Sequence, residues 1–346
     1  MAVEAADRLR ESGRWQEAAD AAFAVVAANP GQAEAWALLG LVLPNLGRID
    51  EAEQAAGRSL ELVAGNPVAL RAMALVMLHQ RNVEDAAKFA ERAWARAPGC
   101  ARTITALAVV RLAQSRLAEA EALLGRAGDI EPIAEVDANR ALLAARRGDL
   151  AEAIHHAELS VGKKPHLTNV WHLLGSLYVQ AGRSADAIAA LEQIVKQDAG
   201  NVAVLTDLGE LYRRADRLSE ALAILGQAVK HAPKAAPCWL NYAIALQAAD
   251  KVPEALDAYE QAAALTPLEE PVHVTMAQLY DKVGRLGAAA ASYRKALDIR
   301  PNLSIQRALS MIHLKMGKTH EALDFIGQDS GFVRFAADGG FKVVVG

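Results

Sequence analysis

The sequence repeats itself with a period of 34 residues, and this period constrains the fold more than any other feature. Residues 182–201, GRSADAIAALEQIVKQDAGN, are followed 34 positions later by DRLSEALAILGQAVKHAPKA at residues 216–235. A repeat of this length is one unit that cannot bury its apolar face alone, so neighbouring units must stack to make a core. One alanine returns in every unit, with two steps shortened to 33 residues: Ala18, Ala52, Ala86, Ala120, Ala153, Ala187, Ala221, Ala255, Ala289 and Ala322.

Each period contains two apolar stripes at helical spacing. In the sixth unit Trp171, Leu174 and Tyr178 share one face at i, i+3 and i+7, and a second stripe begins at Ala187 after the break at Gly182. Another small residue stands twelve positions before each alanine of the series, which allows two helices to approach closely. We therefore expect two short helices per unit, joined by a tight turn, with a proline after most second helices.

Three residues depart from this pattern. Pro44 falls inside the first helix of the second unit, and we expect it to kink that helix or end it early. In the fifth unit Asp137 replaces a large apolar residue and Arg140 replaces a leucine, and we expect looser packing there.

The spelling W-x2-L-G-x2-Y, followed by A-x3-F and A-x4-P, resembles the tetratricopeptide repeat (TPR). The best match is Trp171, Leu174, Gly175, Tyr178 and Ala187. The resemblance is to a bacterial-type tandem TPR array and covers about ten units. It implies an all-α, right-handed superhelix, an α-solenoid over residues 1–327, whose first helices line a concave groove.

Residues 328–346, QDSGFVRFAADGGFKVVVG, do not continue the helical pattern. Two β-prone runs flank a DGG sequence, which predicts a β-hairpin with a glycine-rich turn. Such a tail could cover the end of the last unit. Alternatively, it could be the junction to a second domain, or pair with a strand of a partner.

Composition narrows the class of protein. The chain is 53% hydrophobic, carries a net charge of −4, and has two cysteines, Cys100 and Cys238. These values favour neither a disulfide framework nor nucleic-acid binding, and an RNA-reading repeat array is disfavoured on the same ground. Neither a secretory signal nor an apolar run of about 18 residues is present. We expect a cytoplasmic protein without membrane insertion.

The search for chemistry gives no catalytic constellation. The sequence has no glycine-rich phosphate loop, no G-x-S-x-G and no C-x2-C. His155 and His156 are adjacent and point about 100° apart on a helix, so they cannot chelate a metal as an i, i+4 pair could. HEALD at residues 320–324 lacks the second histidine of a zinc-protease helix. We predict no catalytic residue, no metal site, no cofactor and no enzymatic activity.

Polar residues collect at the groove positions that the TPR resemblance assigns, mainly in units five to nine. Stacking does not require them, and Asn and Asp are weak helix formers, which indicates use in binding. The alternative is that a wide, wet groove accepts any polar residue. The candidate peptide-binding residues are Asn139, Arg146, His172, Ser176, Gln180, Thr206, Asp207, Glu210, Arg213, Arg214, Asn241 and Gln247.

Two groove codes of the family can be compared with these residues. The carboxylate clamp of co-chaperones requires a Lys and Asn set that no adjacent units supply. The asparagine ladder of O-GlcNAc transferases is matched only by Asn139 and Asn241, with Asp207 between them. Neither code is therefore complete in this chain.

The groove positions carry more basic than acidic residues, so the groove is expected to be positive on an acidic chain. The eight basic residues are Arg71, Arg102, Arg146, Arg213, Arg214, Lys282, Arg307 and Lys315, and the five acidic residues are Glu34, Glu135, Asp207, Glu210 and Asp281. The sequence therefore predicts a protein–protein interaction adaptor or scaffold that binds an extended or helical, acidic segment of a partner protein. The alternative is a substrate-recruiting TPR portion of a larger bacterial transferase, O-GlcNAc-transferase-like or sulfotransferase-like, with its catalytic domain outside this chain. The sequence specifies neither the partner nor the oligomeric state.

Overall fold

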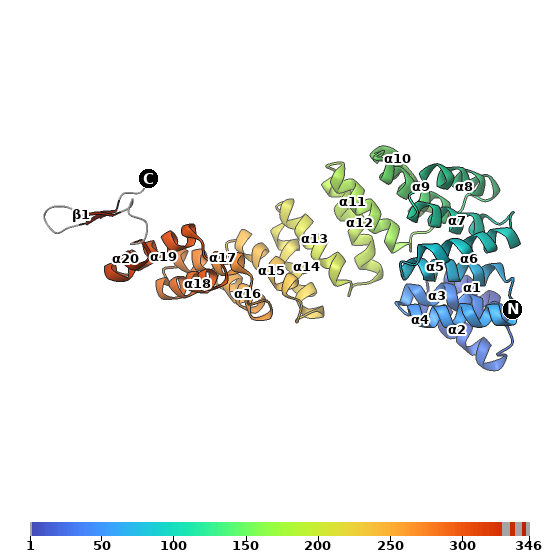
Figure 1. Ribbon diagram of the computed structural model, residues 1–346, viewed down its shortest axis with the longest axis horizontal. Helices are drawn as coiled ribbons and strands as arrows, with labels where there is room; N and C mark the ends of the chain where they lie inside the picture. Colours follow the sequence, from blue (N-terminus) through green and yellow to red (C-terminus); the bar gives the residue numbers. More distant parts are fainter. Residues whose placement is uncertain (1, 327–332, 336–340, 344–346) are drawn as a thin grey trace. The chain divides into compact units, whose positions relative to one another are not determined.

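The computed structural model describes residues 2–326, 333–335 and 341–343. The chain divides into two compact units, residues 1–197 and residues 198–346, and each is described by itself. In both units the helices follow one another as antiparallel pairs (Figure 1). This all-α solenoid of paired helices confirms the fold class expected from the repeat.

The first unit, called unit 1, contains six helix pairs. Its elements are α1 (Ala2–Glu11), α2 (Trp15–Ala28), α3 (Ala33–Val42), the 3₁₀ helix η1 (Leu43–Leu46), α4 (Ile49–Leu62), α5 (Pro67–His79), α6 (Val83–Arg96), α7 (Ala101–Ala113), α8 (Leu117–Ile130), α9 (Ala134–Arg147), α10 (Leu150–Lys163), α11 (Thr168–Gln180) and α12 (Ser184–Gln197).

The described residues of the second unit, called unit 2, form four helix pairs and two short strands. Its elements are α13 (Val202–Arg214), α14 (Leu218–His231), α15 (Ala236–Ala248), α16 (Val252–Leu265), α17 (Glu270–Lys282), α18 (Leu286–Ile299), α19 (Leu303–Lys315), α20 (Thr319–Ile326), β1 (Val333–Phe335) and β2 (Phe341–Val343).

The series of alanines lies at the contacts inside the helix pairs, and each of its ten members is 0% exposed. Close approach also explains the glycines at the matching positions of the first helices. A Cβ on Gly209 would lie 2.4 Å from Leu225 Cγ, and one on Gly40 would lie 3.0 Å from the Cβ atoms of Ala56 and Ala72. Small residues are needed here because a larger side chain would separate the helices.

The turn inside each pair uses one residue with positive φ. Glycine supplies it in six pairs, as at Gly148 and Gly182, with φ of 81° and 71°. Arg81, Ser115, Asp216 and Asp250 adopt the same conformation in the other four, with φ between 55° and 61°. Left-handed backbone is unfavourable for these side chains, so their turns are less stable than the glycine turns.

A hydrogen bond explains the Pro-x5-Trp sequence that links one repeat to the next repeat. Trp171 Nε1 donates to the Pro165 carbonyl at 2.8 Å, and Trp239 Nε1 donates to the Pro233 carbonyl at 2.9 Å. Thus the residue that ends one second helix also fixes the start of the following first helix. The equivalent pairs are Trp36 with Pro30 at 2.9 Å and His273 with Pro267 at 3.1 Å.

Pro44 ends a helix early, as expected: α3 stops at Val42, and the next four residues form η1. Asp137 behaves differently from the expectation. It is 4% exposed, and Lys163 Nζ lies 2.5 Å from its carboxylate and 2.7 Å from the Pro132 carbonyl. An ion pair, rather than looser packing, therefore replaces the apolar anchor at this place.

The strands β1 and β2 pair antiparallel, with Val333 opposite Val343 and Phe335 opposite Phe341. The expected glycine-rich turn between them, and most of the tail, lie outside the described residues. The role of residues 328–346 therefore stays a prediction. Within the described part of the chain, no helix is long and apolar enough to cross a membrane.

Candidate binding sites

Unit 2 has a groove across the first helices of three consecutive repeats, α13, α15 and α17. It encloses about 570 Å³. Its floor includes the apolar side chains of Leu240 and Ile244, and polar groups stand among them. We call this the unit 2 groove; it is lined by Arg213, Leu240, Ile244, Gln247, Ala248, Tyr259, Glu269, Pro271, Val272, Thr275 and Gln278.

Hydrogen bonds within the protein hold two polar side chains of the unit 2 groove in place. Gln247 Oε1 accepts a hydrogen bond from the Tyr259 hydroxyl at 2.8 Å. Burial raises the pKa of Tyr259 to about 12, so this hydroxyl remains a donor at neutral pH. The Thr275 hydroxyl donates to the Pro271 carbonyl at 2.9 Å. With its oxygen occupied, Gln247 presents an amide NH₂ donor, as backbone recognition requires.

The structure brings some of the predicted residues of unit 2 together and leaves others apart. Arg213 and Gln247 both line the groove. Arg213 is also held by Glu210 of its own helix, at 2.7 and 2.8 Å. Thr206 donates to the Val202 carbonyl within α13. The remaining predicted residues lie on the same helices but outside the groove lining, namely Asp207 and Arg214 on α13 and Asn241 on α15.

The predicted residues of unit 1 have more varied places. Arg146 Nη1 donates to the Leu112 carbonyl at 2.6 Å, so it ties α9 to α7. Asn139 donates to the Glu135 carbonyl at 2.7 Å and lines a separate cavity. The other three, His172, Ser176 and Gln180, are exposed on α11.

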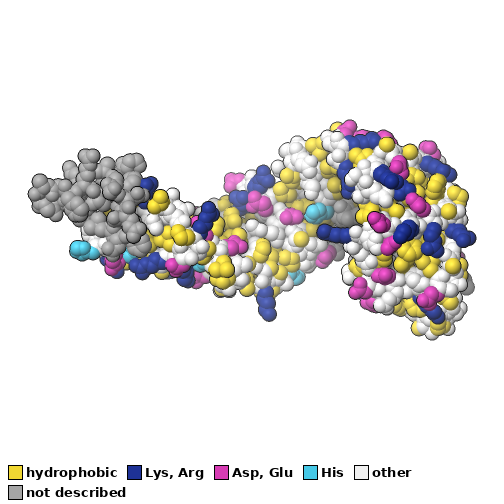
Figure 2. Space-filling view, in the orientation of Figure 1, with side chains coloured by type: hydrophobic (Ala, Val, Ile, Leu, Met, Phe, Trp, Pro, Cys, Tyr) yellow, Lys and Arg dark blue, Asp and Glu magenta, His cyan; other side chains and the backbone are white. Residues whose placement is uncertain are grey.

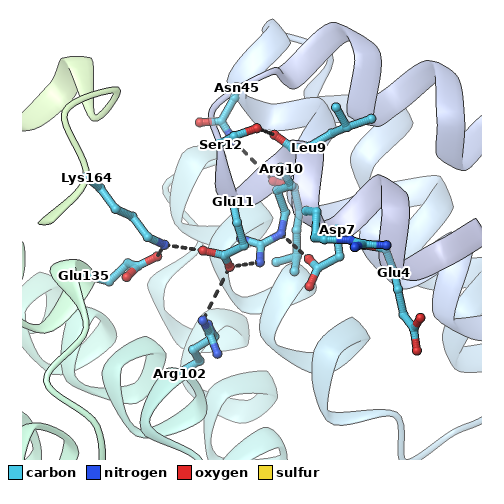
Figure 3. A network of polar contacts seen from close by, with 12 residues as sticks. Glu4, Asp7, Leu9, Arg10, Glu11, Ser12, Asn45, Arg102, Glu135 and Lys164 are labelled. Carbon is cyan, nitrogen blue, oxygen red and sulfur yellow. Dashed lines mark hydrogen bonds and ion pairs between the residues drawn. The ribbon is translucent and has the colours of Figure 1, made fainter. Parts of the chain in front are cut away.

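That cavity lies beside a contact, within unit 1, between the end of α1 and the loop that follows α10. Glu11, the last residue of α1, accepts hydrogen bonds from Arg10, Arg102 and Lys164 (Figure 3). Lys164 is 153 positions away in sequence and also donates to Glu135 at 2.8 Å. The network thus connects the first repeat to the loop after α10.

Ring contacts support the same closure. Trp15 meets His166 edge-on, with ring centroids 6.1 Å apart. A Cβ on Gly13 would lie 2.6 Å from the His166 ring, and Gly13 has a φ of 76°. The turn between α1 and α2 therefore packs directly on the loop between α10 and α11.

The cavity beside this network, called the unit 1 cavity, has a volume of about 190 Å³. Three arginines from three helices reach it, and Glu135 is the one acidic residue of its lining. Its walls are otherwise amide, hydroxyl and apolar groups. The lining residues are Arg10, Trp15, Leu41, Asn45, Arg71, Leu75, Arg102, Thr105, Ala106, Val109, Glu135 and Asn139.

Arg71 differs from the two arginines beside it. Arg10 is paired with Asp7 and Glu11, and Arg102 lies 3.4 Å from Glu11. Arg71 makes no hydrogen bond or ion pair with any described residue, and its Nε is shielded from water without a partner. Burial, helped by the charges of Arg10 and Arg102, lowers the pKa of Arg71 to about 10. Arg71 remains a cation at neutral pH, but its charge is poorly compensated.

Basic and acidic side chains lie close together both on the visible face of unit 1 and along α17 and α19 of unit 2. Figure 2 shows basic and acidic side chains mixed over the visible face of unit 1. In unit 2, Lys282 pairs with Asp250 at 2.7 Å, and Lys315 pairs with Asp281 at 2.6 Å. Of the eight basic groove positions counted in the sequence, these two, Arg213 and Arg102 are thus already paired with carboxylates.

The remaining chemical candidates are isolated. Over the described ranges, no three His, Cys, Asp or Glu side chains come together as a metal-binding group. The rings of His155 and His156 are 5.4 Å apart and tilted, as expected for neighbours on a helix. Cys238 is buried and Cys100 is partly buried.

Sequence reasoning did not bring the residues of the unit 1 cavity together as a site. Arg71, Arg102 and Glu135 belong to the groove positions whose charges were summed, and Arg10 lies outside those positions. Their positions within the repeats could have placed each on a first helix. Their meeting depends on the contact between α1 and the loop after α10, which no local pattern encodes.

Comparison with known proteins agrees with this architecture. Models of the tetratricopeptide repeat match residues 3–67, 144–206, 178–240 and 271–303. No curated protein sequence matches the chain.

Several solved structures are similar. The C-terminal part of a TPR repeat-containing protein from Cytophaga hutchinsonii is 16% identical with a TM-score of 0.57, covering 67% of this chain and 96% of that one. Cut9, in the Cut9–Hcn1 hetero-tetramer of APC/C, is 18% identical with a TM-score of 0.53, covering 89% of this chain and 59% of that one. MamA is 23% identical with a TM-score of 0.42, covering 45% and 91%. At these identities the likeness concerns the fold alone, and the family models, which together match more than half of the residues, show that the chain belongs to the tetratricopeptide repeat family.

Proposed function

We propose that this protein is a binding scaffold that holds an extended, acidic segment of a partner protein along the first helices of consecutive repeats. The unit 2 groove is the main contact. Membership of the TPR family supports a role in protein interaction, and a scaffold of this kind needs no catalytic residue.

The observation that carries this proposal is the groove itself. It crosses three consecutive first helices and encloses about 570 Å³, a size typical of sites that accept several side chains. Leu240 and Ile244 offer apolar contact, while Gln247 and Thr275 offer hydrogen bonds. An extended backbone can use such amides and hydroxyls, each bond adding about 1 kcal/mol net.

The acidic character of the segment rests on the basic residues of α13. Arg214 is exposed in the last turn of this helix, next to Arg213 at the groove. Arg213 is shared with Glu210, so Arg214 supplies the stronger attraction for a carboxylate. Because such a contact is exposed, we expect binding to weaken as salt is raised.

The test begins with a displayed library of random 12-residue peptides, selected on the full chain. The best peptide is then labelled, and its affinity is measured by fluorescence anisotropy for three double variants. These are Gln247→Ala with Thr275→Ala in the groove, Asn241→Ala with Arg214→Ala beside it, and Lys230→Ala with His231→Ala on α14 as the control.

We expect acidic peptides to be enriched, and the first two variants to lose about 1–3 kcal/mol of binding while circular dichroism shows that they remain folded at the assay temperature. The control should bind like the wild type. Peptides without acidic residues, or equal affinity for all three variants, would contradict the proposal.

A further inference from the structure

The unit 1 cavity contains an arginine, Arg71, that is paired with no residue in the described part of the chain. Guanidinium groups in partly buried places are normally matched with carboxylates, because an unmatched charge away from water is costly. Around Arg71 this match is missing, although Asp7, Glu11 and Glu135 all lie in the same network. Asp7 and Glu11 are paired with Arg10, Arg102 and Lys164, and Glu135 binds Lys164 through Oε1 while its Oε2 is buried without a partner among the described residues.

The charged residues of the cavity lining are mostly basic. Its lining holds three arginines and one glutamate. Arg10 is fully engaged with Asp7 and Glu11, and Arg102 is held more loosely by Glu11 at 3.4 Å and by Glu131 at 3.8 Å. The Nε atoms of Arg71 and Arg102 are both shielded from water without partners. A bound anion would compensate the charge of Arg71, and a monovalent anion would repel Glu135 less than a dianion would.

The rest of the lining describes the body of the ligand. Leu41, Leu75, Ala106 and Val109 form an apolar wall. The volume of about 190 Å³ is below the range of about 300–1,000 Å³ for drug-sized ligands, so it admits a short stem only.

We propose that the unit 1 cavity binds a carboxylate group on a short apolar stem, held by Arg71 and Arg102. The carboxylate comes either from a free small carboxylic acid or from one residue of a partner chain. This site is independent of the unit 2 groove, and it stands or falls without the function proposed above. The lowered pKa of Arg71 agrees with it, since a bound anion would relieve the uncompensated charge.

Trp15 lines the cavity and provides a local readout. The five tryptophans of the full chain give five indole N–H signals in a ¹⁵N NMR spectrum, and Trp15→Phe identifies the relevant one. We would titrate sodium butanoate, its neutral analogue butanamide, and sodium phosphate at constant ionic strength. Two acetylated peptides, Gly-Gly-Gly-Val with a free carboxyl end and the same peptide amidated, distinguish a chain end from a free acid.

We expect butanoate or the free-ended peptide to shift the Trp15 signal, and the neutral analogues to leave it in place. A peptide response stronger than that of butanoate would identify a partner chain as the source, and the reverse would identify a free acid. No response to either carboxylate, an equal response to butanamide, or an equal response to phosphate would overturn the proposal.

Variants locate the response. Arg71→Met keeps the stem of the side chain and should weaken carboxylate binding about tenfold or more. Val109→Met leaves Arg71 intact but fills the apolar wall, and it should also weaken binding. Arg58→Met, on the outer surface of α4, is the matched control and should change nothing. Undiminished binding by both cavity variants, with native circular dichroism, would show that the ligand lies elsewhere.

Discussion

Units 1 and 2 are built from the same repeat but treat the polar residues of their first helices in opposite ways. In unit 1 the end of α1 meets the loop after α10, and the charged residues Glu11, Lys164 and Glu135 bond to one another across that contact. In unit 2 the groove of α13, α15 and α17 stays open, and Gln247 is held from below by Tyr259. The same repeat can therefore enclose a small cavity or present a long groove.

The difference shows that the residues that stack the repeats and the residues that determine the surface are separate sets. Stacking depends on alanine and glycine at fixed positions, which are equally buried in both units, as Ala153 and Ala221 show. The surface depends on a few polar residues that do not repeat. Substitutions in the first group should therefore act alike in the two units, and substitutions in the second should not.

The largest effect is expected from enlarging the buried alanines. Ala221→Leu in unit 2 and Ala153→Leu in unit 1 should each overpack a helix pair and cost about 1–3 kcal/mol. Chemical denaturation measures the loss. The matched controls are Ala223→Leu and Ala151→Leu, two positions away on the same helices and exposed. Variants of the buried alanines that are as stable as their controls would show that the series is misplaced.

The next effect should occur in unit 1 alone and depend on pH. Burial by itself raises the pKa of Glu11, but the hydrogen bond from Lys164 and the charges of Arg10 and Arg102 outweigh it and lower the pKa from 4.5 to about 2. The folded state thus favours the ionised carboxylate. Its contribution is complete above pH 4.5 and is lost as the pH falls from there toward 2.

Glu11→Gln should therefore destabilise the protein by about 1–2 kcal/mol at pH 7, after allowance for solvent screening, and by much less as the pH falls to 2 and below. Denaturation curves of both proteins across this pH range measure the difference. Asp250→Asn is the comparison in unit 2, because its pair with Lys282 is exposed, and it should show a smaller change. An unchanging difference between wild type and Glu11→Gln from pH 7 to 2 would contradict the closure network.

The smallest effect concerns the turns. Ser115 adopts a φ of 61°, so Ser115→Gly should stabilise the protein by about 0.5–1 kcal/mol. Gly148→Ala is the reverse experiment. Gly148 has a φ of 81°, and a Cβ added to it would meet no atom within 4 Å, so the loss of stability would be due to the backbone alone. Shifts in the thermal melt should have opposite signs; the same sign in both would refute the explanation.

Most of the fold follows from the sequence because stacking is local. The period, the alanine series and the early end of α3 at Pro44 are all consequences of contacts within one or two repeats. The expected looser packing at Asp137 is not seen, because Asp137 pairs with Lys163. This lysine lies 26 positions away and does not recur in other repeats. A repeat pattern predicts the contacts that all repeats share and misses the contacts that occur in one repeat only.

The candidate sites were less predictable for the same reason. Arg213 and Gln247 line the unit 2 groove, while Arg146 joins α9 to α7. Whether a polar residue on a first helix faces a groove or bonds to its own protein depends on neighbours in other repeats. The hydrogen bond between Lys164 and Glu11 joins residues 153 positions apart, and it depends on the curvature summed over several repeats.

Hydrogen exchange of the full chain, with and without the selected 12-residue peptide, tests the central claim most directly. We predict that the peptide slows exchange along α13, α15 and α17 and leaves their partner helices α14, α16 and α18 unchanged. Protection confined to α14, α16 and α18, or to unit 1, would contradict the assignment of the unit 2 groove as the protein-binding surface.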